Sequence, residues 1–403
     1  MKIGFLGNTN NYPFTLARAF RRAGHDVLFI VDELDSLHRP EGKYPEVEAD
    51  YGDWLREIVP IRPIDIVLNR GNVRKARKLL ADRDLLVLND FGPAVFARSA
   101  TPTFIILTGA DLESYANPAY AEAVALHSKW SALRRVGSAL KRGIYRRLVR
   151  LQRLGISRAA LVEYSFPGLL PPGDTLLGGM GVGPERRCWF MLTDPLLIPF
   201  SEPPDNKPLR VFGMARLNWV RPFPIGINLE LDDKRTDLLL EGLAEFFQQS
   251  GEPLDIRLVK KGLHVEQTMR YAQELGIDRW ITWLREMTQS EFYSELASAN
   301  IVMDHFGSGT IGLGVRDALA AGRPVIVNEP TGLFARYLGE DLPVLRAATR
   351  QEIARQLQCL CSDRNLRHTL GARARAFAER HCSPDVAAKL IMERTQPWRE
   401  ANK

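Results

Sequence analysis

Cysteine is scarce in this chain of 403 residues, with only Cys188, Cys359, Cys361 and Cys382 present. So few cysteines in so long a sequence exclude a disulfide framework. The one close pair, Cys359 and Cys361, has a single residue between its members, whereas zinc hooks use a C-x2-C spacing. We therefore expect four reduced thiols.

Long apolar runs are also missing, and none approaches the roughly 18 to 20 residues that span a bilayer. The first apolar residues, Ile3 to Leu6, give way to the polar residue Asn8 too early for the core of a secretory signal. We expect a cytoplasmic protein in which any membrane contact is peripheral, on the inner face of the membrane.

Acidic residues are absent from one stretch. Between His127 and Arg158 the chain has ten Lys or Arg residues and no Asp or Glu, although its overall net charge is only +6. Apolar residues there recur at steps of three and four, from Trp130 to Leu151, which predicts an amphipathic helix over 127–158. Such a helix can lie on an anionic membrane surface, or it can pack its apolar stripe on a sheet and leave the basic face in water. We do not expect nucleic acid as a partner, because neither an aromatic ladder nor a known reader motif accompanies the charge.

The remaining pattern is that of two α/β halves separated by the proline-rich stretch 199–208, where proline prevents a central strand. Both halves contain short apolar runs with few polar residues, which is typical of parallel strands buried on both faces. We therefore predict an α/β fold with two doubly wound domains, at 1–200 and 201–384, an amphipathic helix over 385–403, and ligands in the cleft between the domains. The runs predicted as strands are 3–6, 27–31, 64–68, 85–88, 104–107 and 159–162 in the first half, and 209–214, 256–259, 280–284, 301–303, 324–327 and 342–345 in the second.

A glycine-rich segment in the second half carries most of the chemistry. A predicted strand ending at Met303 leads into a loop with Gly307, Gly309, Gly312 and Gly314, and the loop leads into a helix that ends near Gly322. Glycines allow a close approach of the backbone to a ligand, and the N–H groups of a helix start suit a phosphate. A carboxylate one turn into the helix, Asp317, can accept hydrogen bonds from a sugar or ribose diol. Glycines at such a turn can equally serve tight packing alone.

This segment resembles the C-terminal domain of the GT-B glycosyltransferases, in particular glycosyltransferase family 4, whose pattern is E-x2-G-x4-E-A-x-A-x-G-x-P-V. Gly312, Ala318, Ala320, Gly322, Pro324 and Val325 match in register. Residues 233–240 are similar to the family's K-G-x-D-x-L-L helix start, and 213–216 to its strand-end G-R. The run 273–304 is similar to the family's signature before the glycine loop. The resemblance covers roughly residues 209–330.

The resemblance implies a GT-B fold of two Rossmann-like domains. We predict that the donor is held by Gly309, Thr310, Ile311, Gly312, Asp317, Arg285 and Asn10. The first glutamate of the pattern falls on Gly309 and the second on the shorter Asp317, so the contact with the donor sugar must come from elsewhere. Backbone N–H groups at 309–311, Asp304 and His305 are the candidates. The resemblance implies retention of the anomeric configuration, and the lost glutamate leaves inversion open.

Transfer from a nucleotide sugar releases a diphosphate, whose negative charge needs fixed cations, N–H dipoles or a metal ion. We predict Arg216 and Lys234 as the cations, with Arg221 as a rival of Arg216. The only D-x-D sequence, Asp82-Arg83-Asp84, precedes a predicted strand. We therefore predict no metal site and no cofactor beyond the nucleotide-sugar co-substrate.

On the acceptor side, Asp111 follows a predicted strand and can orient an acceptor hydroxyl or the donor sugar. Such an Asp is equally suited to capping the next helix. Asn10 lies in the first strand-to-helix loop, where Asn side chains can face a ligand or simply favour a turn.

The sequence thus predicts a glycosyltransferase, a hexosyltransferase by type, that moves a sugar to a carbohydrate or lipid-linked acceptor in polysaccharide or glycolipid assembly. Two alternatives stay open: an inverting transferase or sugar-nucleotide epimerase on the same fold, and a non-catalytic protein that binds a nucleotide or sugar.

Overall fold

The structure, a computed structural model, describes residues 1–32, 35, 38–44, 46–49, 52–126, 134–223, 232–307, 311–330 and 332–401. The chain divides into two compact units, which are described separately below. Unit 1 comprises Met1–Phe190 and Pro384–Lys403, and unit 2 comprises Met191–Ser383. The proline-rich stretch 199–208 lies within unit 2.

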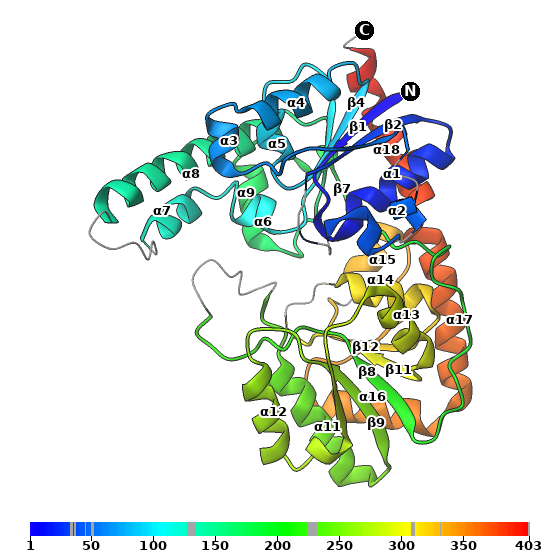
Figure 1. The fold of residues 1–403 in the computed structure, drawn as a ribbon. Coiled ribbons are helices and arrows are strands. Elements are labelled where there is room, and N and C mark those ends of the chain that lie inside the picture. The colour runs from blue at the N-terminus through cyan, green and yellow to red at the C-terminus, as the bar shows by residue number, and fades with distance from the viewer. Residues whose placement is uncertain are drawn as a thin grey trace. The chain divides into compact units, whose positions relative to one another are not determined.

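Unit 1 contains a parallel sheet of seven strands in the order β3-β2-β1-β4-β5-β6-β7, with helices on both of its faces (Figure 1). Its central strands are buried on both faces, as expected for a doubly wound sheet. The strands are β1 (Lys2–Leu6), β2 (Asp26–Val31), β3 (Leu55–Glu57), β4 (Leu85–Leu88), β5 (Thr103–Ile106), β6 (Leu161–Glu163) and β7 (Arg187–Cys188). The helices are α1 (Tyr12–Arg22), α2 (Glu46–Ala49), α3 (Pro63–Val67), α4 (Gly71–Leu79), α5 (Gly92–Val95), α6 (Ala110–Glu113), α7 (Pro118–Leu126), α8 (Arg134–Ser157), α9 (Pro171–Gly178) and α18 (Pro384–Glu400).

The C-terminal helix α18 packs against α1, so both chain ends belong to unit 1 (Figure 1). Arg22 of α1 donates to Asp385 of α18 at 3.0 Å, and Arg394 of α18 donates to the carbonyl oxygen of Arg187 at 3.3 Å. The side chains of Ala387, Ala388 and Ile391 on α18 are buried.

Unit 2 contains a parallel sheet of six strands in the order β10-β9-β8-β11-β12-β13. Its core is formed by apolar residues of the strands together with α11 and α16, which pack against each other. The strands are β8 (Leu209–Gly213), β9 (Leu254–Val259), β10 (Ile281–Leu284), β11 (Ile301–Met303), β12 (Val325–Val327) and β13 (Leu345–Arg346). The helices are α11 (Thr236–Ser250), α12 (Val265–Glu274), α13 (Gln289–Ser298), α14 (Leu313–Ala320), α15 (Leu333–Leu338), α16 (Arg350–Ser362) and α17 (Arg364–His381).

The predicted α/β class is confirmed, one predicted strand is wrong, and the run predicted at 342–345 shares only Leu345 with the strand β13. Residues 64–67 belong to the helix α3, which ends before Leu68, because Pro63 is at its start, where the missing N–H costs nothing. Asp65 then accepts a hydrogen bond from the backbone N–H of Arg62 at 3.0 Å, which caps the first turn. The short edge strands β3 and β7 were not predicted, because Arg56, Glu57 and Arg187 leave them without an apolar run.

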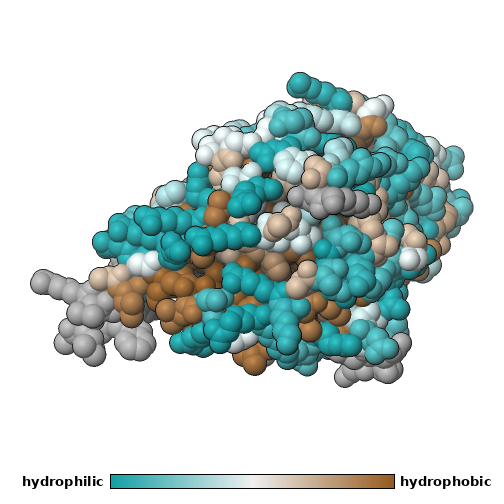
Figure 2. Space-filling view, turned by 90° about the horizontal axis from the view of Figure 1, so that it is seen from above, coloured by the Kyte–Doolittle hydropathy of each residue, from teal (hydrophilic) through white to brown (hydrophobic). Residues whose placement is uncertain are grey.

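The predicted basic helix is present as α8, whereas residues 127–133, with Trp130 and Leu133, lie outside the described residues. Its apolar stripe is buried only in part: Leu148 is buried, and Leu140 is 66% exposed. Figure 2 shows hydrophobic and hydrophilic residues side by side at this end of unit 1. Within the described part of the chain, none of the helices combines the length and apolar composition of a membrane span.

Candidate functional site

In unit 2, the strand order reverses at β8. The chain runs outward from β8 through β9 to β10 and then returns to β11 on the other side of β8. The loops after β8 and β11 therefore leave the carboxyl end of the sheet in opposite directions, and such switch points hold ligands in open α/β sheets. Arg216 follows β8, and Asp304 to Gly312 follow β11.

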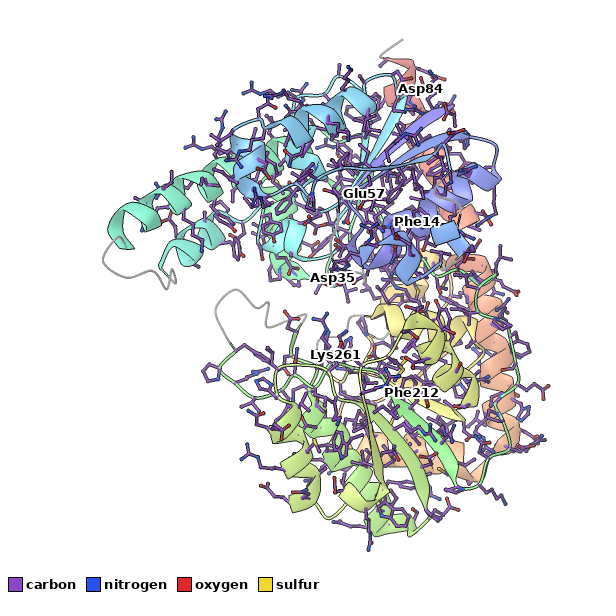
Figure 3. The ribbon with its side chains drawn as sticks, in the orientation of Figure 1. Phe14, Asp35, Glu57, Asp84, Phe212 and Lys261 are labelled. Carbon is purple, nitrogen blue, oxygen red and sulfur yellow. The ribbon has the colours of Figure 1, made fainter. Side chains whose placement is uncertain are left out.

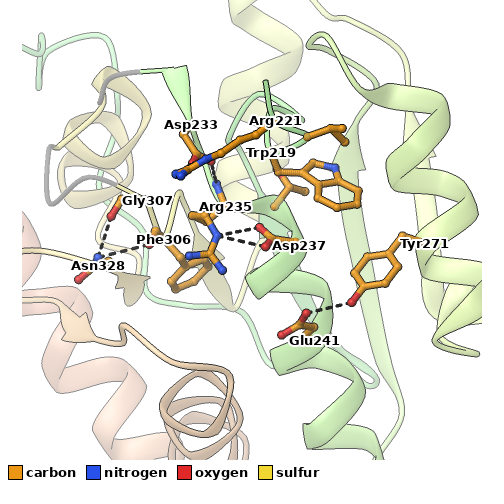
Figure 4. A network of polar contacts seen from close by, with 12 residues as sticks. Trp219, Arg221, Asp233, Arg235, Asp237, Glu241, Tyr271, Phe306, Gly307 and Asn328 are labelled. Carbon is orange, nitrogen blue, oxygen red and sulfur yellow. Dashed lines mark hydrogen bonds and ion pairs between the residues drawn. The ribbon is translucent and has the colours of Figure 1, made fainter. Parts of the chain in front are cut away.

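Backbone hydrogen bonds tie these two loops to Lys234. The N–H of Lys234 donates to the carbonyl oxygen of Asn218 at 2.9 Å, and its carbonyl oxygen accepts from the N–H of Phe306 at 3.0 Å. Lys234 is thus held between the loop after β8 and the loop after β11. Asn328, which follows β12, adds a side-chain bond to the carbonyl oxygen of Gly307 at 2.9 Å (Figure 4).

The charges around Lys234 form a compact group. Burial lowers the pKa of Lys234, and the nearby carboxylate of Asp304 opposes this shift. The positive charge of Arg216 also acts on Lys234, which places both predicted cations at the switch point. Burial lowers the pKa of His305 well below its usual value, so this imidazole is neutral.

The two rival arginines have different surroundings. Arg221 forms an ion pair with the buried carboxylate of Asp233, with its Nε donating at 3.0 Å (Figure 4). The exposed guanidinium of Arg216 has no ion pair or hydrogen bond with any residue that the structure describes. Arg216 is therefore available to an anion, whereas Arg221 is already neutralised.

An aromatic pair supports the loop that carries Arg216. Trp219 stacks on Tyr271 with ring centroids 5.3 Å apart, and its indole N–H donates to Thr268 at 2.9 Å (Figure 4). The Nδ1 of His264 accepts from the backbone N–H of Trp219 at 3.1 Å, and burial lowers the pKa of His264. These contacts fix the backbone a few residues beyond Arg216.

The glycine turn leads into α14. A Cβ atom on Gly307 would lie closer than 3.0 Å to the carbonyl oxygen of Asp233, so only glycine fits there. Gly312 is the residue before the first turn of α14, and no side chain caps this helix start. Ile311 is buried beside it, whereas the predicted donor residues Gly309 and Thr310 lie outside the described residues.

Asp317 lies one turn into α14 and is 8% exposed. One oxygen of its carboxylate accepts a hydrogen bond from the hydroxyl of Thr193. Thr193 was not singled out in the sequence, because it lies 124 positions away and its segment carries no motif.

Arg285 does not join this group. It follows β10, the edge strand that β9 separates from β8. Its guanidinium forms an ion pair with Glu291 at the start of α13. The structure therefore places Arg285 two strands away from Arg216.

Unit 1 has its own reversal of strand order, at β1 between β2 and β4. Asn89, which follows β4, connects the loops there. Its oxygen accepts from the N–H of Thr9 at 2.8 Å, and its amide donates to Asp111 at 3.1 Å. Asn89 was not predicted as a site residue. The sequence signal that could have indicated it is its position directly after an apolar run. Asn10 has a left-handed backbone (φ 56°), and its N–H donates to the Nδ1 of His38 at 2.9 Å.

The carboxylate of Asp111 is buried and surrounded by donors. It accepts from the backbone N–H groups of Thr108 at 2.9 Å, Gly109 at 3.0 Å and Leu112 at 3.1 Å. Burial raises the pKa of Asp111 to about 6, against the effect of these donors. Through these bonds the residue anchors the loop between β5 and α6.

The chemistry that this arrangement allows is anion binding at the unit 2 switch point. Among the described residues, no group of three or more His, Cys, Asp or Glu side chains is placed to hold a metal ion. What the site offers is two cations, a glycine turn and an uncapped helix start with its partial positive charge.

No protein-family model matches the chain, and no curated protein matches it by sequence. Several solved structures are similar over almost the whole chain. HepE of Anabaena in complex with UDP has a TM-score of 0.63 and 16% identity, over 98% of this chain and 99% of HepE. Sucrose-phosphate synthase of Thermosynechococcus elongatus has a TM-score of 0.60 and 13% identity, over 100% of both chains. WaaG, a glycosyltransferase involved in lipopolysaccharide biosynthesis, has a TM-score of 0.55 and 15% identity, over 97% of this chain and 99% of WaaG.

These neighbours are GT-B glycosyltransferases, and the two parallel sheets of unit 1 and unit 2 match them along the chain. The fold predicted from the glycine segment and the strand pattern is therefore confirmed: this chain has the GT-B fold.

Proposed function

We propose that this chain is a glycosyltransferase that moves a hexosyl group from a nucleotide-sugar donor to a carbohydrate or lipid-linked acceptor. Unit 2 binds the donor in this proposal, and unit 1 binds the acceptor. One observation carries the proposal: Arg216, Lys234 and the start of α14 meet at the switch point of unit 2. The similarity to HepE, which was solved with UDP and with UDP-glucose, supports it at the level of the fold.

The chemistry assigned to these groups is stabilisation of the leaving diphosphate. The bond between the anomeric carbon and the diphosphate breaks, a bond between that carbon and the acceptor oxygen forms, and the proton of the acceptor hydroxyl passes to the leaving diphosphate. Negative charge then builds up on the diphosphate, where fixed cations and N–H dipoles stabilise the transition state more than the ground state. We assign this task to Arg216, Lys234 and the α14 start, without a requirement for a divalent metal ion. Loss of one such donor typically lowers kcat about 100- to 1,000-fold.

We also propose transfer with retention of the anomeric configuration. Two described residues of unit 1 that could act as a base, Asp111 and His38, are engaged in other contacts. The carboxylate of Asp111 accepts from three backbone N–H groups. The Nδ1 of His38 accepts a hydrogen bond from the backbone N–H of Asn10, so the neutral ring carries its proton on Nε2. The Nε2 atom therefore cannot accept a proton from an acceptor hydroxyl. Inversion needs a base that removes the proton of the acceptor hydroxyl, and neither group is suited to that role.

The first test is binding, by calorimetry with UDP, GDP, ADP and dTDP. The Arg216→Met and Lys234→Met variants should each bind the preferred diphosphate about 10- to 100-fold more weakly, the effect of one lost charge-assisted contact. Lys261→Met is the matched control, because Lys261 also follows a strand of this sheet but is paired with Glu286 at 2.9 Å (Figure 3). Its affinity should stay within about twofold of the unchanged protein. A protein that binds none of the four diphosphates would contradict the proposal.

The second test is turnover, followed as release of the diphosphate from nucleotide sugars in the presence of carbohydrate and lipid extracts. Release should continue in EDTA, and proton NMR of the product should show the anomeric configuration of the donor. Tight binding without release from any donor would instead favour the non-catalytic alternative.

We further propose that α8 brings the protein to an anionic membrane surface. The side chains of Arg147 and Arg150 are exposed on this helix, as is the apolar side chain of Leu140. Glu122 of α7 pairs with Arg142 at 3.4 Å and with Arg146 at 2.7 Å, so part of the basic face is neutralised within the protein. The remaining charges, next to an exposed leucine, are the combination that binds an anionic lipid surface.

Sedimentation with vesicles of phosphatidylglycerol tests this second proposal. The protein should bind at low salt and dissociate at high salt, and vesicles of phosphatidylcholine should not bind it. Reversal of two charges by Arg147→Glu and Arg150→Glu should weaken binding at least about 10-fold, at roughly 1 kcal/mol for each basic residue. The control is Lys75→Glu with Lys78→Glu on α4, which changes the net charge equally. Equal losses in both double variants would contradict a specific role of α8.

A further inference from the structure

The carboxylate of Asp304 lies at the switch point of unit 2, and the proposed function assigns it no task. Asp304 follows β11 directly, and its side chain is 5% exposed. An ideal Cβ on Gly312 would lie 3.0 Å from its Oδ2, so the carboxylate points to the start of α14. The absence of a side chain at Gly312 leaves this oxygen accessible from the helix start.

Three other carboxylates of this region are engaged. Asp233 pairs with Arg221, Asp237 accepts from Arg235 at 3.0 Å, and Asp317 accepts from Thr193. Asp304 accepts only from the backbone N–H of His305, and within the described residues it forms no ion pair and no side-chain hydrogen bond.

A buried carboxylate with unused acceptor positions costs free energy unless a ligand or a cation satisfies it. Lys234 lies close enough to lower the pKa of Asp304, whereas burial, the larger effect, raises it to about 6. The acceptor positions left on Asp304 suit a hydrogen-bond donor, and Lys234 already supplies a positive charge nearby, so a neutral donor fits. Hydroxyl groups of a sugar meet both conditions.

We propose that Asp304 is the carboxylate that accepts hydrogen bonds from the hydroxyl groups of the donor sugar. The inference rests on the proposed function, because it assumes that the diphosphate lies against Lys234 and the α14 start. The sugar attached to that diphosphate then lies within reach of Asp304. Gly312 has no side chain, so nothing at this position stands between Asp304 and the helix start. Asp304 is thus a specificity-determining residue that selects donors by the hydroxyl groups on one edge of the ring.

The proposal predicts opposite effects on two ligands. In Asp304→Asn, UDP-glucose should bind about 10- to 100-fold more weakly, since hydrogen bonds to a charged acceptor are lost. UDP should bind equally well or more tightly, because the substitution removes a negative charge near the diphosphate. If another base is preferred in the diphosphate titrations, the pair becomes GDP with GDP-mannose or ADP with ADP-glucose. A purely structural role of Asp304 would weaken both ligands alike.

The matched control is Asp232→Asn. Asp232 also acts on the charge of Lys234. It precedes Asp233 in the sequence, away from the loop after β11, and it is not next to Gly312. In this variant the affinities for UDP and UDP-glucose should change by the same factor. Parallel changes in Asp304→Asn as well would overturn the proposal.

Donors that each lack one hydroxyl provide a measurement that does not depend on the stability of a variant. The unchanged protein should bind one or two of the 2-, 3-, 4- and 6-deoxy forms of UDP-glucose at least about 10-fold more weakly than UDP-glucose itself. Asp304→Asn should lose this discrimination for the same forms, to within about threefold. Discrimination that is identical in the two proteins would refute the assignment, whereas a protein that binds neither UDP nor UDP-glucose would refute the proposed function instead.

Discussion

Two glycines on the helix α8 provide a matched pair for substitution by alanine. An ideal Cβ on Gly143 has no atom within 4 Å, whereas one on Gly155 would lie closer than 3.0 Å to the carbonyl oxygen of Pro93 in α5. A backbone oxygen cannot rotate away, so α8 or α5 must move in Gly155→Ala. Gln152, one turn earlier, is fully buried and would move with the helix.

The hydrogen bonds of Gln152 set the size of the effect. Its amide donates to the carbonyl oxygens of Asp90 at 2.8 Å and Asp111 at 3.1 Å, and its oxygen accepts from the N–H of Ala94 at 3.0 Å. Weakening two of these bonds costs about 2 kcal/mol, and overpacking costs about 1 to 3 kcal/mol. Against this stands a gain in helix propensity of about 0.5 to 1 kcal/mol, which both substitutions share.

Gly143→Ala should therefore raise the free energy of unfolding of unit 1 by about 0.5 to 1 kcal/mol, and Gly155→Ala should lower it by about 2 to 4 kcal/mol. For a unit of this size the melting temperature changes by about 2 to 4 °C for each kcal/mol. Urea unfolding followed by circular dichroism measures the difference, and hydrogen exchange of the α8 amides assigns it to unit 1. Equal stability of the two variants would show that α5 and α8 are not in close contact at Gly155.

Two further predictions concern unit 2. Gly307→Ala should weaken binding of the preferred nucleoside diphosphate at least about 10-fold, because the new Cβ would overlap the carbonyl oxygen of Asp233 and displace the loop after β11. Calorimetry measures this affinity. An unchanged affinity would contradict the close approach of Gly307 to Asp233. Burial raises the pKa of Asp304 to about 6 from 3.8, so the folded protein takes up this proton before the unfolded chain does. The free energy of unfolding should thus rise as the pH falls from about 6 to 3.8, by about 3 kcal/mol at 1.36 kcal/mol for each pKa unit. Asp304→Asn should lack this contribution, and identical pH profiles of the two proteins in urea unfolding would refute it.

The local patterns of the sequence were sufficient for most of the regular structure. Runs of buried residues predicted the central strands of both sheets, and their order along the chain indicated two doubly wound units. The prediction was wrong at 64–68, where five residues with four apolar side chains fit a strand or a helix. Pro63 and the capping contact of Asp65 decided for the helix α3.

The candidate site could be predicted only in part. Arg216, Lys234 and Gly312 are predicted from the sequence because each lies next to a strand end or a helix start, and their roles stay predictions. The choice between Arg216 and Arg221 needed the structure, because it depends on the ion pair of Arg221 with Asp233. Arg285 shares the strand-end position of Arg216, but the pairing of β10 with β9 places it at the sheet edge.

Some buried polar residues gave no sequence signal at all. Arg323 lies between Gly322 and Pro324 in the matched motif, and nothing in the pattern marks it as buried. In the structure its exposure is 0%, and its guanidinium donates to the carbonyl oxygens of Leu296 at 2.8 Å and Ser201 at 2.9 Å. Its partners lie 27 and 122 positions away, so only the folded chain can supply them.

Hydrophobic periodicity, glycine positions and proline determined by themselves that this chain forms two parallel sheets with helices between the strands, because these signals act over one or two turns of chain. The tertiary structure alone decided which strand ends are neighbours, and therefore which charges meet. Strand order depends on pairing between distant segments, and a residue's charge environment depends on burial that those pairings create. The group of Arg216, Lys234 and Asp304 exists for that reason: Val211 of β8 and Ile301 of β11 are 90 positions apart in the sequence but are partners in the sheet.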